Sequence, residues 1–342
     1  MKKIDKYLNI LIKLVKGQMG IQYLNTYMKN RAKEESIIKT NLNELENKII
    51  AVDTSIYLYR FLSENSLLEN MYLMISLFKY YKIIPIFVFD GKPPKEKLGI
   101  IEKRNNEKNN AENKCNQLEE QLTTISDINK RNDIIDCINS LKKKCIRLKY
   151  TDIISVRNLL DAFGVYYIEA LGEADELCAK LVIKKYAYAC LSEDMDLFLY
   201  GCPRVMRYLS LANQTVILYH LDKILLDLDL TFEEFKNICV LSGTDYNYNN
   251  TKNLDLNLYK ILEYFKEYKL YCKNNTEKLD FYNWLDKKYD FIDNIYDLYN
   301  TYLMFETSKI KLPKIKYSNL NKNSNQLKIK EIMEPYGFIF LD

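Results

Sequence analysis

Seven carboxylates in this sequence stand where apolar runs end or helices begin, so their side chains could bind divalent cations. In chain order they are Asp53, Asp90, Glu173, Asp175, Asp194, Asp196 and Asp245. Two like charges about 4 Å apart repel by about 4 kcal/mol at an effective dielectric constant of 20, so a convergent set of acids needs cations. Oxygen ligands alone suit Mg²⁺ or Mn²⁺. If the seven converge, the sequence predicts a site for such ions.

The same composition argues against other common site chemistries. The chain has one histidine, His220, and its eight cysteines include no CxxC pair. We therefore expect neither a structural zinc site nor a catalytic serine–histidine triad. Cysteines that are spread singly indicate reduced thiols packed as small apolar groups, which is typical of an intracellular protein.

An alternation of strands and helices is predicted to position the acids. Short apolar runs at 48–53, 83–90, 164–170 and 186–192 are typical of buried parallel strands, and helical spacing of apolar residues fills 55–62 and 67–81. We therefore predict an α/β fold with a mostly parallel central sheet flanked by helices. Functional groups in such sheets gather beyond the carboxyl ends of the strands. Each acid alone also fits an N-cap or turn, whereas seven together favour a metal site.

A polar, basic insertion separates the second and third predicted strands. Residues 91–150 contain 14 Lys and Arg against 9 Asp and Glu, and end in LKKKCIRLK. We predict one or two long exposed helices, with Lys142, Lys143 and Lys144 as nucleic-acid contacts; a solvated helical hairpin or a coiled-coil contact is the alternative. Lys97 and Arg104, seven residues apart, share one helix face and could reach a phosphate near Asp90, although ordinary surface cations fit the spacing equally well.

Length and charge indicate a globular protein that binds polyanions. The 342 residues are 48% hydrophobic, and the formal charge of +4 becomes +11 once the seven acids are set aside. No stretch of 18 uncharged apolar residues predicts a membrane span. The first 18 residues are predicted to be an amphipathic extension rather than a signal peptide. Seven lysines without an acid between 309 and 330 indicate either a phosphate-tracking segment or a solubilising tail.

Several motifs together resemble the flap endonuclease and XPG-type family of structure-specific 5′ nucleases. These motifs occur in family order, over roughly residues 19–250: MGIQYL, AVDTSIYLYRFL, PIFVFDGKPPKEKLGIIEKR, GEADELCAKLV, LSEDMDLFLYGCPRVMRYL and LSGTDYN. Each is weak alone, but VFDGKPP and SEDMD in this order are specific. The resemblance implies a PIN-like nuclease core with a helical arch.

The resemblance also implies roles for individual residues. The seven acids become a two-metal site for Mg²⁺, with Mn²⁺ as a substitute, and Lys97 and Arg104 become the catalytic basic pair at the scissile phosphate. Tyr59 matches the aromatic residue that stacks on a base, and Gly20 matches the family's amino-terminal glycine. The segment after Asp245 lacks the family's glycines, which puts a K⁺ site in doubt.

The resemblance predicts a boundary pattern and a set of partners. We expect an extension at 1–18, a nuclease core at 19–220 with an arch at about 95–150, a helix–two-turns–helix region at 221–280, and a helical, basic extension at 281–342. The expected partner is DNA with a 5′ end or flap, the protein acting as a monomer, with no membrane and no evident sliding-clamp peptide; GFIFLD is a degenerate relative of one. The nucleus, or a viral replication compartment in the cytoplasm, is the expected location.

Three functions remain open at this point. The leading one is a metal-dependent 5′ nuclease, either flap endonuclease or 5′–3′ exonuclease, acting on flapped, nicked or recessed DNA in replication, repair or recombination. The second is an RNA-directed nuclease on the same scaffold. The sequence shows no clear residue that would recognise the 2′-hydroxyl group, which distinguishes RNA from DNA. A non-catalytic nucleic-acid-binding scaffold is the third.

Overall fold

A computed structural model describes residues 21–124, 127–246, 256–276, 279–290, 292–313, 315, 320 and 322–340. The amino-terminal extension, Gly20 and most of the segment after Asp245 lie outside these residues. The chain forms two compact units, each assembled from separate stretches. Unit 1 comprises Met1–Ile38, Asp194–Pro203 and Tyr219–Lys309, and unit 2 comprises Lys39–Glu193, Arg204–Leu218 and Ile310–Asp342. These compact units do not test the functional domain bounds expected from the sequence, so those bounds stay a prediction.

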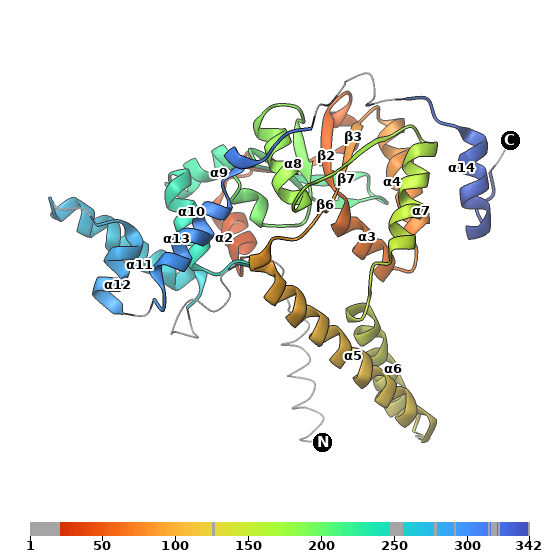
Figure 1. Cartoon of the computed structure of the whole chain (residues 1–342), viewed down its shortest axis with the longest axis horizontal. Helices are drawn as coiled ribbons and strands as arrows, with labels where there is room; N and C mark the ends of the chain where they lie inside the picture. Colours follow the sequence, from red (N-terminus) through yellow and green to blue (C-terminus); the bar gives the residue numbers. More distant parts are fainter. Residues whose placement is uncertain are drawn as a thin grey trace. The chain divides into compact units, whose positions relative to one another are not determined.

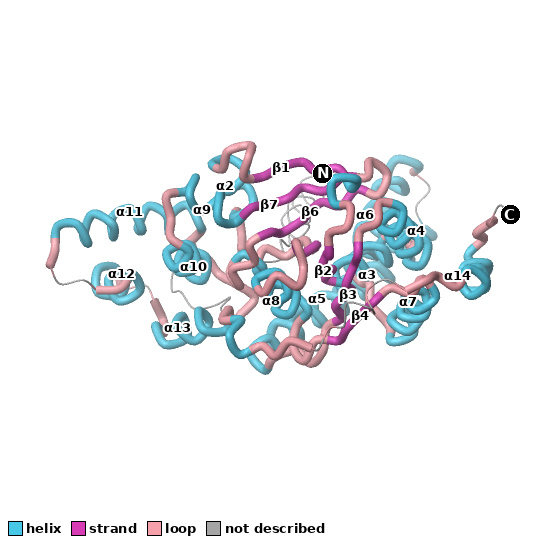
Figure 2. Tube along the Cα trace, turned by 90° about the horizontal axis from the view of Figure 1, so that it is seen from above, coloured by secondary structure: helices cyan, strands magenta, loops and turns pink. Residues whose placement is uncertain are grey.

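Unit 2 is built on a seven-stranded sheet in the order β1-β7-β6-β5-β2-β3-β4, which Figure 2 shows in magenta. The strands are β1 (Ile37–Asn41), β2 (Ile49–Asp53), β3 (Ile84–Phe89), β4 (Tyr166–Glu169), β5 (Ala189–Leu191), β6 (Arg204–Ser210) and β7 (Thr215–His220). The pairings β2 with β3, β2 with β5, β3 with β4 and β5 with β6 are parallel. The predicted mostly parallel sheet is therefore confirmed.

Helices cover both faces of this sheet. They are α3 (Thr54–Ser63), α4 (Leu67–Tyr80), α7 (Tyr150–Ala162) and α8 (Ala174–Ile183). The connections through α3, α4 and α7 carry the chain from β2 outward to β4, whereas α8 returns it to β5 on the other side of β2. Because such crossovers are right-handed, α8 covers the face opposite α3, α4 and α7. Burial on both faces explains why β2 and β3 are almost continuously apolar.

The predicted insertion is a long helical hairpin within unit 2. α5 (Leu98–Thr124) and α6 (Ile128–Lys144) run side by side and project from the rest of the unit (Figure 1). Their shared core is small, with Ala111, Cys115, Ile138 and Leu141 buried between them. We call this pair the arch hairpin. Its sparse apolar pattern follows from the fact that each helix buries only a narrow stripe against the other.

The carboxyl-terminal residues 322–340 pack on unit 2. The segment includes α14 (Gln326–Met333), and the backbone N–H of Asn325 donates to the Ala162 carbonyl at 2.7 Å. Phe338 and Phe340 place their rings 4.9 and 6.0 Å from the ring of Tyr72. Residues 322–340 are thus folded against α4 and α7 rather than extended into solvent.

Unit 1 is helical, with no strand of its own among its described residues beyond the outer ends of β1 and β7. Its helices are α2 (Leu24–Arg31), α9 (Leu221–Leu228), α10 (Phe232–Leu241), α11 (Leu258–Asn274), α12 (Phe281–Tyr289) and α13 (Ile295–Met304). α10 packs on α11 and α13, and an aromatic cluster that includes Phe265, Phe281 and Trp284 joins α11 to α12. All eight cysteines of the chain are free thiols.

No helix in the described part of the chain is long and apolar enough to cross a lipid bilayer.

Candidate metal and nucleic-acid site

The strand order of unit 2 reverses between β2 and β5, and Asp53 lies at this point. Connections from β2 lead towards β3 and β4, whereas β5 leads to β6 on the other side. Ligands of open α/β sheets bind beyond the carboxyl ends of the strands at such a reversal. Asp53 is the last residue of β2 and is 5% exposed, and the Ser192 hydroxyl, just beyond β5, donates to its carboxylate at 2.8 Å.

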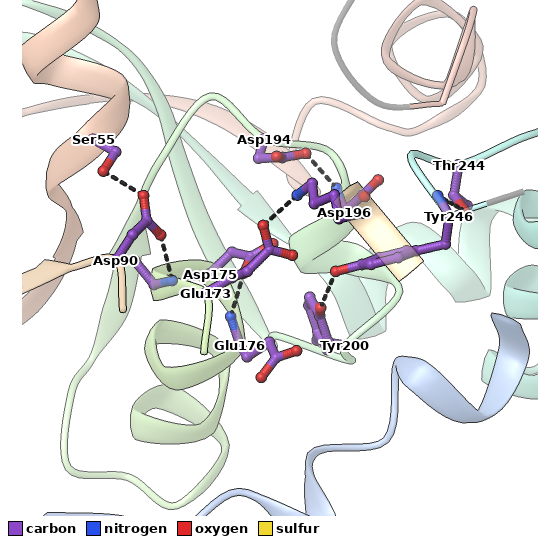
Figure 3. A network of polar contacts seen from close by, with 12 residues as sticks. Ser55, Asp90, Glu173, Asp175, Glu176, Asp194, Asp196, Tyr200, Thr244 and Tyr246 are labelled. Carbon is purple, nitrogen blue, oxygen red and sulfur yellow. Dashed lines mark hydrogen bonds and ion pairs between the residues drawn. The ribbon is translucent and has the colours of Figure 1, made fainter. Parts of the chain in front are cut away.

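Asp90, which follows β3, lies beside the same strand ends in unit 2. Its carboxylate accepts hydrogen bonds from the Ser55 hydroxyl and, at 2.8 Å, from the Ala174 backbone N–H (Figure 3). Ser55 lies in the first turn of α3, and Ala174 is the first residue of α8. A single exposed carboxylate therefore ties two helix amino termini together.

The start of α8 supplies two further carboxylates in unit 2. Glu173 is the residue before the helix, and Asp175, in the first turn, is 7% exposed. Lys97 forms an ion pair with Glu173, and the two side chains are only 11% and 14% exposed. An ammonium therefore already compensates one of the predicted metal ligands. The predicted placement of Lys97 near the acids is consistent with this contact.

The acids of unit 1 lie on two of its loops. Asp196, at the start of a short 3-10 helix, is 2% exposed, and its backbone N–H donates to Asp194 at 2.9 Å. Asp245 follows α10 in a turn that also contains Gly243, with φ of +96°, and buried Thr244. The Thr244 hydroxyl accepts from the Tyr246 backbone N–H at 3.2 Å, which fixes the turn beside Asp245 (Figure 3).

The donor set of the seven acids consists of carboxylate oxygens alone, which fits Mg²⁺ or Mn²⁺ and excludes soft metals. Among the described residues, no three acidic, thiol or imidazole side chains stand together in a preformed metal cage. Instead, hydroxyls, backbone N–H groups and the Lys97 ammonium contact the acids.

Tyr59, on α3, lies near cations from α5 and from the segment that follows α6, all within unit 2. Its ring is 42% exposed, and the Lys108 ammonium lies 5.0 Å from the ring centroid. Burial and the Asp90 charge raise the pKa of Tyr59, whereas Arg104 and Arg147 oppose this. Burial, with repulsion from Arg147 and Arg104, lowers the pKa of Lys108. Three cations thus converge on one partly exposed aromatic ring.

The basic residues predicted to contact nucleic acid differ in their surroundings. The charge of Arg104 acts on Tyr59, a neighbour that was not predicted for it, whereas Lys142 forms an ion pair with Glu119 across the arch hairpin at 2.8 Å. Lys108 and Arg147 were not predicted from the sequence. Lys108 follows Arg104 by one helical turn, a signal that was available, but Arg147 comes close only because the hairpin folds back.

Two domain families match the chain. The XPG N-terminal domain matches residues 19–111, and the XPG I-region matches residues 164–245. Flap endonuclease 1 of Methanococcus aeolicus is 30% identical over 254 residues, which cover 69% of this chain and 72% of that protein. Flap endonuclease 1 of Xenopus tropicalis is 30% identical over 217 residues, and the match covers 53% of its length. The chain thus spans little more than half of some relatives that it matches.

Solved structures share the fold. The catalytic core of Rad2 in complex with a DNA substrate matches with a TM-score of 0.66 and 21% identity, over 93% of this chain and 96% of that one. Flap endonuclease-1 from Methanococcus jannaschii matches with a TM-score of 0.61 and 20% identity, over 93% of each chain. At these identities the similarity concerns the fold alone.

Proposed function

Because this chain belongs to the XPG-type flap endonuclease family of structure-specific 5′ nucleases, we propose that it hydrolyses phosphodiester bonds in flapped, nicked or recessed DNA at a site for two divalent ions. The observation that carries this proposal is the placement of Asp53 at the reversal of strand order, with Asp90 and Glu173 at the neighbouring strand and helix ends. A group of carboxylates at that edge of a sheet is suited to hard cations and a phosphate.

The proposed ligand set consists of the seven acids predicted from the sequence. Its members are Asp53, Asp90, Glu173, Asp175, Asp194, Asp196 and Asp245. Mg²⁺ is the proposed ion, and Mn²⁺ its substitute, because both prefer oxygen ligands. Two such ions supply an activated water and stabilise the leaving oxygen of an in-line displacement. K⁺ has no place in the proposal, since the segment expected to hold it lies outside the described residues.

Lys97 is proposed to exchange partners when substrate arrives. In the structure its ammonium neutralises Glu173. Divalent ions at the carboxylates would release this ammonium, and a scissile phosphate nearby would then become its partner. Arg104, in α5, contributes a second cation one helix segment after Lys97. Lys97 and Arg104 together would stabilise the charge that develops on the phosphoryl group. The products would be a 5′-phosphate and a 3′-hydroxyl.

Tyr59 and its three surrounding cations are proposed to hold the unpaired nucleotide beside the cleaved bond. A base stacked on an aromatic side chain gains about 1 to 3 kcal/mol, which offsets part of the cost of unpairing. Lys108 and Arg147 join Arg104 as phosphate contacts in this proposal, because Lys108 lies over the ring and the charges of Arg104 and Arg147 act on Tyr59 together with that of Asp90.

We do not assign sliding-clamp binding to the carboxyl-terminal motif GFIFLD. The residues of GFIFLD that the structure describes pack against unit 2, where Phe338 and Phe340 contact Tyr72. Their aromatic rings therefore serve the fold of this chain.

Cleavage of end-labelled substrates tests the proposed function. Purified protein with Mg²⁺ should cut a 5′-flap DNA, and the panel should include nicked, blunt duplex, single-stranded and RNA forms of the same sequence. Asp194→Asn should abolish cutting, whereas Glu34→Gln, which removes an exposed acid outside the ligand set, should cut like the wild type. Cleavage by Asp194→Asn at the wild-type rate would refute the ligand assignment, and wild-type protein that cuts none of the DNA substrates would refute the function.

A further inference from the structure

Three tyrosines from distant parts of the sequence form one aromatic surface on unit 1. Tyr23 immediately precedes α2, Tyr27 lies within α2, and Tyr259 lies in the first turn of α11. The ring centroid of Tyr259 is 6.0 Å from that of Tyr23 and 6.2 Å from that of Tyr27. Tyr23 is 39% exposed and Tyr259 is 43% exposed. We call these three residues the tyrosine patch.

Tyr23 adopts a backbone conformation that a bulky residue rarely takes. Its φ is +67°, in the left-handed region that favours glycine. Non-glycine residues in this region cost about 1 to 3 kcal/mol, and such strain is concentrated at functional sites. The fold thus keeps a large, partly exposed aromatic ring at a position where glycine would be less strained.

The patch continues into positive charge along α2. Tyr23, Tyr27 and Arg31 follow one another at four-residue intervals, so their side chains lie on one helix face. Arg31 is exposed, and its charge acts on Tyr27, lowering the pKa of that hydroxyl while burial raises it. No residue of α2 is acidic, and Lys29 is a second exposed cation near its end. Aromatic rings followed by cations are the combination that binds bases and the phosphates between them.

From the ring contacts, the strained Tyr23 backbone and the row of cations on α2, we infer that the tyrosine patch binds unpaired nucleotides of the nucleic-acid substrate by stacking. This inference rests on the proposed nuclease function for the identity of the ligand. The patch belongs to unit 1, whereas Tyr59 belongs to unit 2. Stacking on exposed rings tolerates any base, so the patch would hold a strand without selecting its sequence.

Binding without cleavage tests the inference. Full-length protein in EDTA is titrated into fluorescently labelled single-stranded DNA and into blunt duplex DNA, and fluorescence anisotropy gives the affinity. Tyr23→Gly combined with Tyr259→Ala removes two rings, and glycine suits the φ of residue 23, so folding should be retained, as a thermal melt will show. We expect single-stranded DNA to bind at least about fivefold more weakly, the lower limit for losing one stacked base, and duplex binding to change less than twofold.

Matched variants separate stacking from other causes. Tyr23→Phe with Tyr259→Phe keeps both rings and should bind like the wild type. Tyr296→Ala removes a ring that is 76% exposed on α13 of the same unit, and should also have no effect. Unchanged binding of single-stranded DNA by the double ring deletion would overturn the inference. So would an equal loss for blunt duplex, or sedimentation showing a wild-type dimer that the deletion converts to a monomer.

The outcome is distinguishable from a failure of the proposed function. If the wild type cuts no flap DNA with Mg²⁺ but the ring deletion still weakens single-stranded binding, the proposed function fails and the patch stands. If the wild type cuts flap DNA and the ring deletion binds normally, the patch alone is refuted.

Discussion

Replacing Lys97 with methionine should destabilise the protein when divalent ions are absent, and the loss should shrink as Mg²⁺ is added. Lys97 and Glu173 are paired with 11% and 14% of their side chains exposed. Removing one partner of a buried ion pair costs about 3 to 5 kcal/mol, because the other charge is left uncompensated. Since both groups keep some contact with solvent, we expect the lower end, about 3 kcal/mol. A Mg²⁺ ion at Glu173 would replace the missing charge and reduce the loss to less than about 1 kcal/mol.

Urea unfolding followed by far-ultraviolet circular dichroism, repeated over a range of Mg²⁺ concentrations, measures this effect. Glu173→Gln and the double variant complete a double-mutant cycle, which isolates the coupling between the two side chains. The double variant should lose less stability than either single variant, because no charge remains unpaired. A Lys97→Met penalty that stays constant at every Mg²⁺ concentration would refute the assignment of Glu173 as a metal ligand. A coupling near zero would refute the ion pair itself.

Three further predictions concern the fold that positions the site. Gly91→Ala should destabilise by more than about 3 kcal/mol in urea unfolding, because a Cβ there would lie 1.9 Å from the Ala170 carbonyl oxygen; Gly99→Ala, in open space on α5, should instead stabilise by up to about 1 kcal/mol. Burial lowers the pKa of Lys236 from 10.5 to about 8, so the native state releases a proton that the unfolded chain still holds between these values, and stability should rise with pH across that window. The free energy of unfolding of Lys236→Met should therefore be up to about 3 kcal/mol higher than that of the wild type at pH 7, and most of this difference should be gone by pH 10. A stability difference that does not change with pH would contradict this. Phe338→Ala should cost about 1 to 2 kcal/mol through lost contact with Tyr72, whereas Ile339→Ala, at a residue 88% exposed, should cost less than about 0.5 kcal/mol; equal costs would contradict the packing of this segment.

The sequence predicted those strands whose burial on both faces leaves a continuous apolar run. β2, β3, β4 and β5 lie within the predicted runs, and α3 and α4 begin and end close to the predicted bounds. β1 was missed because IIKTN has only two apolar residues, and β6 because Arg204 and Arg207 interrupt its apolar pattern. β7, with TVILYH, carried a strand signal that could have been used.

The candidate site was predictable only in part, because strand ends are visible in a sequence and packing between distant segments is not. Asp53 and Asp90 could be placed at the edge of the sheet, since each directly ends an apolar run. The hydrogen bond from Ser192 to Asp53 and the approach of Arg147 to Tyr59 depend on which strands and helices become neighbours. The tyrosine patch also depends on packing between distant segments, α2 and α11, and no local sequence pattern predicts it.

The carboxyl-terminal segment shows a different limit. Its lysines indicated a solvated or phosphate-tracking tail, but α14 buries Ile329 and Met333 against unit 2. Two apolar residues one helical turn apart are a weak signal in so basic a segment. Some of the anchoring contacts are backbone hydrogen bonds, such as that from the Lys322 N–H to the Gly164 carbonyl, which no side-chain pattern can reveal.

Anomalous diffraction from crystals grown with Mn²⁺ tests the central claim most directly, because it locates each ion and its ligands without assuming any activity. The account predicts two ions about 4 Å apart, with carboxylates from both Asp90 and Asp194 among their ligands. Single ions bound at separate surface acids, or a strongly bound ion that contacts neither of these residues, would contradict it.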